Sequence, residues 1–287
     1  MKNIHLNIAI PSNVLEDCSD LRSKTQKIGQ IARAAAIFKV EKIIIYHVNK
    51  LINRKFSGDR ELIKGILEYL DCPQYLRKKV FPKVPSFKYI GTLHPLRTPH
   101  HPLENKIAKL ETISIREGLV LFSNQHFSEI DLGLEKSIKI AIPHLPKDQR
   151  IILKLERQGN LITGTPVTKN NTKVYWGFEV EILNESIKDF LKKFSNNLII
   201  ATSKRGSPIN SETQVELLQK LEKKNNLLVL FGSPATGLFE IFTNNNLRLA
   251  DWVDFILNFI PQQGTETIRV EEALFSTLAL INSLLAL

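Results

Sequence analysis

The chain has 287 residues, enough for two domains, and its 43% of hydrophobic residues is ordinary for a protein with a buried core. Its 39 lysines and arginines against 29 aspartates and glutamates give a formal charge of +10, which favours an anionic partner, nucleic acid first, over an indifferent basic surface. Cys18 and Cys72 are the only cysteines, which excludes a disulfide framework and a CxxC metal site and suits a reducing, cytoplasmic compartment.

The first part of the chain alternates between strand and helix patterns. Residues 3–10 alternate and then become apolar, and Lys42–Val48 reads KIIIYHV, so both predict strands. Apolar residues recur at helical spacing in Arg22–Phe38 and in Asp59–Leu70, which predicts two helices. The succession of strand, helix, strand and helix favours βαβ units and a parallel sheet.

The middle of the chain has a different pattern. Five prolines between Phe81 and Pro102 indicate extended connecting chain. Short alternating segments follow, and they predict strands over Thr112–Ile115, Gly118–Ser123, Lys136–Ile142, Ile151–Glu156 and Leu161–Val167. Such a series is typical of a small β-barrel of the OB type, inserted here into the α/β domain. OB barrels often bind oligonucleotides; a barrel used only for packing or protein contact is the alternative.

The α/β pattern resumes after Lys173. The expected elements are a strand over Val174–Leu183, a helix over Ser186–Phe194, a strand over Asn197–Thr202, a basic loop over 203–208 and a helix that begins with a Ser211–Gln214 capping box and ends near Lys224. The last apolar run, Ala273–Leu287, is shorter than a bilayer-spanning helix, and the N-terminal run is too short for a signal peptide. We therefore expect no membrane segment, and a buried or interfacial final helix.

Two apolar runs near the C-terminus, Leu227–Phe231 and Phe255–Ile260, each end in a loop of small residues. In open α/β sheets, ligands bind beyond the carboxyl ends of such strands, and glycines let the backbone approach the ligand closely. The pattern predicts one ligand pocket, although ordinary strand–helix turns have similar composition. Neither loop is a GxGxxG sequence or a P-loop, and the chain has no GxSxG or HExxH motif.

Charged residues lie near these loops and at the ends of other elements. Arg22, Arg205 and Arg269 are candidates for holding a phosphate, although each alone is more often a solvated surface residue. Glu266 and Glu271 are candidates for orienting a ligand or accepting a proton, although a glutamate in a first helical turn usually serves the helix dipole. The histidines of the proline-rich connector have no acidic or cysteine ligand at matching spacing, so no metal site is expected.

Several segments carry a family resemblance. They are LFGSP with GL shortly after it in residues 230–238, NFIPQQGTETIRVEEA in 258–273, LRSKT in 21–25, YWGFEV in 175–180 and TSKRG in 202–206. Together they resemble the SPOUT superfamily of RNA methyltransferases, and within it the archaeal and eukaryotic branch described as RNA uridine-N3 methyltransferases. The resemblance spans nearly the whole chain, and the QGTET…EEA segment is its most specific part.

The resemblance implies a SPOUT-type α/β fold with a C-terminal trefoil knot, formed by residues 1–88 and 173–287, and an inserted OB-like barrel over 89–172. It also implies a homodimer through the knotted C-terminal face, and RNA bound by the barrel and by basic loops. S-adenosylmethionine would lie in the knot. The matching cofactor positions are Phe231, Gly232, Ser233, Gly237, Asn258, Ile260, Gln263, Gly264, Thr265 and Thr267.

The reaction expected from the resemblance is methyl transfer to N3 of a uridine in ribosomal or other structured RNA. We expect Arg22 and Arg205 to grip the phosphate or polarise the base, and Glu266 or Glu271 to orient the cofactor or accept the proton. Two alternatives stay open from the residues alone. They are a non-catalytic RNA-binding or assembly protein with this fold, and a methyltransferase for another base or atom.

Overall fold

The computed structural model describes residues 4–48, 59–159 and 161–286. The predicted strand over 3–10 and the predicted final helix therefore each end on a residue outside the described ranges, Asn3 and Leu287. The chain separates into two compact units. The larger unit consists of Met1–Glu68, Ser86–His94 and Phe178–Leu287, and the smaller unit of Tyr69–Pro85 and Pro95–Gly177.

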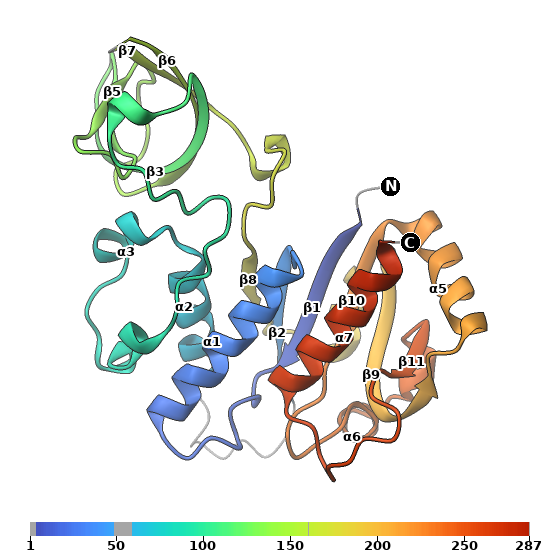
Figure 1. The fold of residues 1–287 in the computed structure, drawn as a ribbon. Coiled ribbons are helices and arrows are strands. Elements are labelled where there is room, and N and C mark those ends of the chain that lie inside the picture. The colour runs from blue at the N-terminus through green and yellow to red at the C-terminus, as the bar shows by residue number, and fades with distance from the viewer. Residues whose placement is uncertain (1–3, 49–58, 160, 287) are drawn as a thin grey trace. The chain divides into compact units, whose positions relative to one another are not determined.

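A parallel sheet forms the centre of the larger unit (Figure 1), as the sequence predicts. Its described strands lie in the order β11-β9-β10-β1-β2-β8. Their bounds are β1 His5–Pro11, β2 Lys42–Tyr46, β8 Glu179–Ile182, β9 Leu198–Pro208, β10 Asn226–Leu230 and β11 Phe255–Asn258. The central strands β1, β2 and β10 are apolar and buried along most of their length, because helices cover both faces of the sheet.

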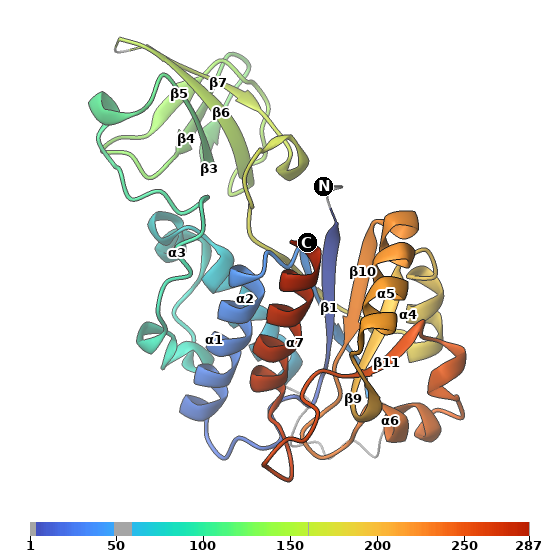
Figure 2. The same cartoon turned by 45° about the vertical axis from the view of Figure 1, so that its right-hand side comes forward.

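Helices α1 and α7 lie side by side on one face of the sheet, and α5 also contacts α7 (Figures 1 and 2). Helices α4 and α6 cover the opposite face through a shared apolar cluster. The described α-helices are α1 Leu21–Ile37, α2 Asp59–Asp71, α3 Gln74–Val80, α4 Ile187–Lys193, α5 Ser211–Lys224, α6 Leu238–Asn244 and α7 Val270–Leu285. Short 3-10 turns occur at Pro85–Phe87, Ile90–Thr92, Ile107–Lys109, Lys169–Asn171 and Leu249–Asp251.

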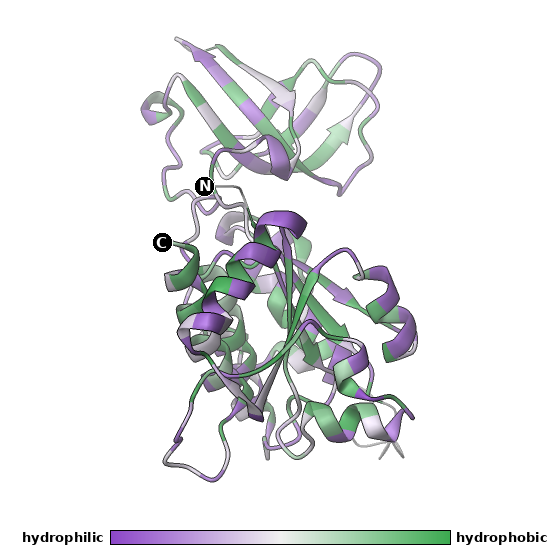
Figure 3. Ribbon diagram, turned by 90° about the vertical axis from the view of Figure 1, so that its right-hand side faces the viewer, coloured by the Kyte–Doolittle hydropathy of each residue, from purple (hydrophilic) through white to green (hydrophobic). Residues whose placement is uncertain are grey.

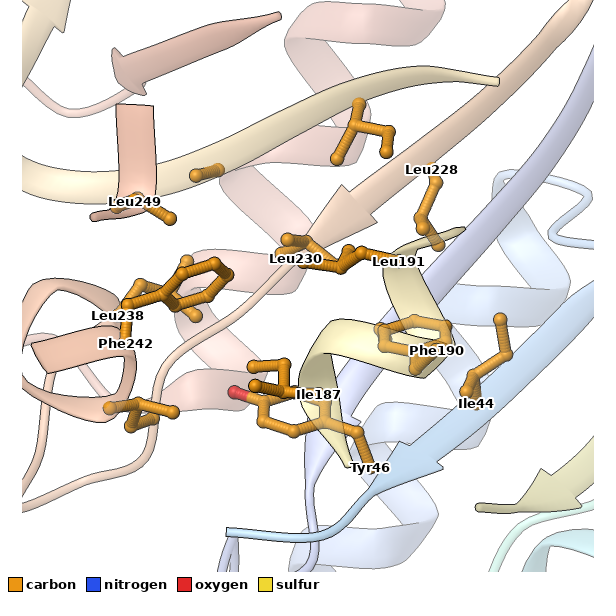
Figure 4. Packing of buried hydrophobic residues seen from close by; sticks show 14 of the residues in the cluster. Ile44, Tyr46, Ile187, Phe190, Leu191, Leu228, Leu230, Leu238, Phe242 and Leu249 are labelled. Atoms are coloured by element: carbon orange, nitrogen blue, oxygen red, sulfur yellow. The ribbon is translucent and has the colours of Figure 1, made fainter. Parts of the chain in front are cut away.

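The cluster under α4 and α6 connects the core to the loop after β10. The rings of Tyr46 from β2 and Phe190 from α4 stack with centroids 6.4 Å apart (Figure 4). The Tyr46 hydroxyl donates a 2.6 Å hydrogen bond to the carbonyl oxygen of Phe231, directly after β10. Burial raises the pKa of Tyr46, so this hydroxyl stays protonated and keeps its donor role. The core therefore fixes the point where the loop begins.

The smaller unit contains an antiparallel, barrel-like sheet with the strand order β5-β4-β3-β6-β7. The strands are β3 Ile113–Ser123, β4 Ser128–Asp131, β5 Ile138–Ile140, β6 Arg150–Gln158 and β7 Leu161–Pro166. Hydrophobic and hydrophilic residues alternate along them (Figure 3), and the inward side chains form one core cluster. The two outer strands approach each other, because a Cβ on Gly164 of β7 would lie 2.5 Å from Ile140 Cδ1 of β5.

Some predicted boundaries in the smaller unit were wrong. The predicted strands 112–115 and 118–123 are one strand, β3, which stays paired with β6 across the intervening residues. Strand β4 was missed because SEID has only two buried positions, Ser128 and Ile130, and no apolar run. Helix α3 was missed because it is a single short helix beside the proline-rich segment.

Other differences lie in the larger unit. The basic segment 203–208 belongs to β9, which pairs with β11 at Ala201 and again at Ser207 and bulges between them. Helix α5 is capped by Asn210 instead of Ser211: the Asn210 side chain accepts a 2.8 Å bond from the Thr213 amide. The predicted strand 174–183 is paired only over its last part, β8. Helix α6 was missed in the loop-like stretch after β10.

Candidate active site

A cavity of about 510 Å³ lies at the carboxyl ends of β9, β10 and β11. Its lining comes from Thr202–Arg205 of β9, from the loop after β10 and the start of α6, from the end of β11 and parts of the loop that follows it, and from the first turns of α7. This is where parallel sheets present ligand sites, because the loops after neighbouring strands meet at one edge. Its volume falls in the range of small-molecule sites.

The loop after β10 is a tight turn held by its own side chains. The Ser233 amide donates to the Thr236 carbonyl at 2.9 Å, and the Thr236 amide donates to the Ser233 hydroxyl at 3.0 Å. A Cβ on Gly232 would lie 3.2 Å from Gly237 Cα and 3.3 Å from the Thr236 carbonyl oxygen, so a side chain there would require these neighbours to shift by a few tenths of an ångström. The small residues of this loop therefore have a packing reason within the turn itself.

The loop after β11 is tied to β9 by polar side chains. The Asn258 amide group donates to the Lys204 carbonyl at 3.0 Å, and its oxygen accepts from the Ile260 amide at 3.0 Å. The Gln263 side chain donates to the carbonyl of Glu266 at 3.1 Å, and Lys204 Nζ donates to that same carbonyl at 3.0 Å. Two neighbouring strand ends are thereby fixed at a defined separation.

Arg205 stands at the cavity with two restraints on its side chain. Its guanidinium forms an ion pair with Glu240 of α6 and lies 4.5 Å from the centroid of the Phe239 ring. The Arg205 side chain is nevertheless 59% exposed, so it stays open to a ligand that enters from solvent. A guanidinium held in this way presents its planar donors in a fixed direction.

Most of the predicted site residues meet at this cavity. The ones that line it are Phe231, Gly232, Ser233, Gly237, Asn258, Ile260, Gln263 and Thr267 from the cofactor set, with Arg205 and Glu266 from the catalytic set. Gly264 and Thr265 belong to the same loop but are not in the lining, and the Thr265 carbonyl accepts a 2.8 Å bond from the Gln263 side chain.

Arg22 and Glu271 do not line the cavity. Arg22 lies in the first turn of α1 with an exposed side chain, and its amide donates to the capping Asp20 carboxylate at 2.7 Å. Glu271 is only 6% exposed and lies 3.2 Å from the ammonium of Lys27. The placement of Glu271 favours a role in holding α7 against α1 over a role in proton transfer.

Comparison with known proteins identifies the family. A family model described as "Putative RNA methyltransferase" matches residues 5–281. This chain belongs to that family. Because the match runs across both units, it includes the cavity of the larger unit and the barrel-like sheet of the smaller one. The family is one of methyltransferase enzymes, so the cavity is a candidate active site.

Curated relatives of this RNA methyltransferase family member carry a more specific name. The mouse and human proteins named 28S rRNA (uridine-N(3))-methyltransferase are each 31% identical over 96% of this chain, which covers 75% and 77% of their lengths. The Drosophila melanogaster protein of that name is 28% identical over 96% of this chain. The chain spans 61% of that fly protein.

Two acidic residues that support the cavity were missed from the sequence. Glu16, after β1, accepts a 3.0 Å bond from the Ala235 amide in the loop after β10. Asp17 accepts a 2.7 Å bond from Lys27 Nζ, and Lys27 in turn pairs with Glu271 at the start of α7. Lys27 offered one signal in the sequence: a lysine next to the mostly apolar helical stretch 28–37 indicates a buried cation that needs an acidic partner. Its carboxylate partners lie on other elements and could not be read from spacing.

Two negative findings complete the description. Among the described residues, no three His, Cys, Asp or Glu side chains gather closely enough to hold a metal ion. Within the described ranges, no helix combines the length and the apolar character needed to span a bilayer.

Proposed function

We propose that this protein is an S-adenosylmethionine-dependent RNA methyltransferase that methylates N3 of a uridine in ribosomal or other structured RNA. The observation that carries the proposal is the cavity at the ends of β9, β10 and β11, in a chain that belongs to an RNA methyltransferase family. The names of the mouse and human relatives support uridine N3 as the target atom and ribosomal RNA as the substrate.

The cavity fits S-adenosylmethionine in size and in chemistry. Apolar walls from Phe231, Leu238 and Ile260 suit an adenine ring, and polar side chains such as Gln263 suit the ribose and the amino-acid end. A side chain at Gly232 would crowd Gly237 and the Thr236 carbonyl, so glycine keeps this turn compact beside the cavity. When bound, S-adenosylmethionine supplies a methyl group on a positively charged sulfur, which N3 accepts as it loses its proton.

Arg205 and Glu266 are the charged side chains that we assign to the chemistry. Uracil N3–H lies on the pairing edge, so the target base must be unpaired or flipped out. Arg205 stabilises the negative charge that develops on the base when N3 is deprotonated, because its donors are held beside the cavity. Glu266 lines the same cavity and is the candidate proton acceptor.

The wider architecture is proposed to be of the SPOUT type, with a C-terminal trefoil knot and a homodimer through that face. The path of the chain supports this proposal, since α7 follows the loop after the edge strand β11 and returns to pack on α1. Leu280 on α7 is 43% exposed and offers apolar surface to a second copy. Arg22, exposed at the start of α1, is then free to act at a neighbouring subunit.

The inserted segment 89–172 is proposed to be an OB-type barrel that binds RNA. Support comes from the strand order β5-β4-β3-β6-β7 and from the close approach of β7 to β5 at Gly164. Charge adds to it: the smaller unit has sixteen lysines and arginines against nine aspartates and glutamates, and so carries most of the net charge of the chain.

Two measurements test the proposal. Isothermal calorimetry with S-adenosylmethionine checks the cavity, and mass spectrometry of nucleosides from incubated ribosomal RNA checks the product. We expect the protein to bind S-adenosylmethionine, and we expect the incubated RNA to contain 3-methyluridine. Absence of cofactor binding at millimolar concentration would favour a non-catalytic RNA-binding or assembly protein. A different methylated nucleoside would retain the enzyme class and refute uridine N3.

A further inference from the structure

The barrel-like sheet turns an aromatic side chain outward where strand alternation would bury it. In β3, Val120 is fully buried, so plain alternation would place Phe122 inward as well. A bulge between Val120 and Phe122 shifts the pairing with β4 and brings Phe122 opposite Glu129. Phe122 is therefore 50% exposed. Bulges commonly re-aim a side chain at a functional surface.

Phe122 belongs to a small cluster of side chains from β3, from the turn between β3 and β4, and from β5. Its ring lies 6.1 Å from the ring of Phe127, at an interplanar angle of 53°. The ammonium of Lys139 lies 5.0 Å from the Phe127 ring centroid. The strand register places Phe122 opposite Glu129 and Glu129 opposite Lys139, so the outward side chains of β3, β4 and β5 share one face. We call Phe122, Phe127 and Lys139 the aromatic platform.

The turn that carries Phe127 is held rigidly. The Asn124 side-chain oxygen accepts hydrogen bonds from the amides of His126 and Phe127 at 2.8 and 2.9 Å. The loop after β5 is joined to the same turn, because the His144 amide donates to the Asn124 carbonyl at 3.1 Å. The exposed side chains of His144 and Lys147 therefore belong to a loop that is hydrogen-bonded to the turn of the platform. Aromatic rings on a fixed turn lose little entropy on binding.

We propose that the aromatic platform stacks the bases of single-stranded RNA. The proposal rests on the proposed RNA-methyltransferase function and names a surface of the smaller unit that binds single-stranded RNA. Every base has a face that stacks on an aromatic ring, and the excess positive charge of this unit favours a polyanion. The Glu129 carboxylate repels a phosphate, so the bases face the rings and the backbone lies toward Lys139.

The test uses the full chain and a fluorescein-labelled oligouridine of about twelve nucleotides in fluorescence anisotropy. We expect Phe122→Ala/Phe127→Ala to weaken binding about tenfold or more, while Phe122→Trp retains affinity. Ile113→Ala is the matched control, since Ile113 is 54% exposed on the same strand outside the platform and should change nothing. Lys139→Ala should lower the dependence of log affinity on log salt by about 0.7.

Three outcomes would overturn the proposal. The first is equal affinity of the double alanine variant and the wild type, which would favour a protein partner for the rings. The second is full affinity in Phe122→Leu/Phe127→Leu, because leucine keeps apolar area but cannot stack. The third is no oligouridine binding by the wild-type protein. Cofactor calorimetry separates these results from failure of the proposed function, because S-adenosylmethionine binding does not involve the platform.

Discussion

The carboxylate of Glu271 lies 3.2 Å from the ammonium of Lys27, and both side chains are almost completely buried. The pair joins the first turn of α7 to α1, and Lys27 also binds Asp17. A buried cation with two carboxylate partners fixes the position of α7, whose first turns line the cavity. These two carboxylates explain how the charge of Lys27 is accommodated in the otherwise apolar interface between α1 and α7.

We expect Lys27→Met to destabilise the protein by about 3–5 kcal/mol, because it leaves the buried Glu271 carboxylate without its cation. Urea unfolding of the full chain measures the change. Lys192→Met is the control, since Lys192 pairs with Asp189 on the exposed face of α4 and its replacement should leave the free energy of unfolding nearly unchanged. The double variant Lys27→Met/Glu271→Gln should recover part of the loss; no recovery would contradict the buried-charge explanation.

Replacement of two glycines near the cavity by alanine should change the melting temperature to different extents. A Cβ on Gly206 would lie 2.7 Å from the Leu257 carbonyl carbon, so Gly206→Ala pushes β9 away from β11 and should lower both melting temperature and cofactor affinity. Nothing lies within 4 Å of the corresponding Cβ on Gly264. Gly264→Ala should therefore leave the melting temperature unchanged. Thermal shift and calorimetry with S-adenosylmethionine check both, and equal melting temperatures of the two variants would refute the explanation.

Arg205→Ala should lower the methyl-transfer rate about a hundredfold while cofactor affinity changes less than threefold, because the side chain is assigned to the base and not to the cofactor. Single-turnover methylation with ribosomal RNA measures the rate. Arg248→Ala is a suitable control, since Arg248 is a 79% exposed surface arginine paired with Asp251. A variant with the wild-type rate would remove Arg205 from the reaction.

Arg22→Ala should abolish methyl transfer and leave cofactor binding within a few-fold, as proposed from the family resemblance. Arg22 does not line the cavity of its own chain, so this expectation needs the proposed dimer. Mixing Arg22→Ala with Arg205→Ala protein tests that point, because a mixed dimer would regain one intact site. Activity of Arg22→Ala near the wild-type level would exclude the role.

Acid should destabilise the smaller unit. Burial, with the charge of its neighbour His101, lowers the pKa of His100 to about 3, and burial lowers the pKa of His101 to about 4, from 6.5. The unfolded chain therefore binds more protons below pH 6.5, and stability falls as the pH decreases toward these values. Each of the two histidines should lower the free energy of unfolding by about 2 kcal/mol when the pH falls to 5.

Melting temperatures at pH 7.5 and pH 5 measure this effect. In the folded state the Nε2 atoms of His100 and His101 lie 2.9 and 2.8 Å from the same acceptor, the Asp71 carbonyl. In His100→Gln/His101→Gln the difference between the two pH values should shrink. An unchanged difference would assign the acid sensitivity to other groups.

The sequence predicted the larger unit well because its strands are uninterrupted apolar runs. Lys42–Tyr46 and Asn226–Leu230 are buried on both faces, so their composition indicates their structure. The site loops were also predictable, since Gly232 comes shortly after β10 and Gly264 lies in the loop after β11. Short elements were not: β4 buries only Ser128 and Ile130 on one face, and four alternating residues resemble a turn.

Supporting contacts could not be predicted because they join distant parts of the chain. Glu16 meets Ala235 because β1 and β10 are neighbours in the sheet, and Lys27 meets Glu271 because α7 packs against α1. The bulge that exposes Phe122 depends on pairing between β3 and β4, and the latter strand was itself not predicted. Periodicity describes one element at a time, whereas these features need the pairing of two.

The central position of β1 has a consequence for protein synthesis. Its two edges pair with β2 and with β10, and His5 lies opposite Asn226. The ribosome releases β10 long after β1 and β2, so one edge of β1 has no partner during most of translation. Such an edge is a template for wrong pairing, whereas the smaller unit is complete before β9 is made and can fold first. Slow assembly of the parallel sheet around an early-folded insert is therefore built into the strand order.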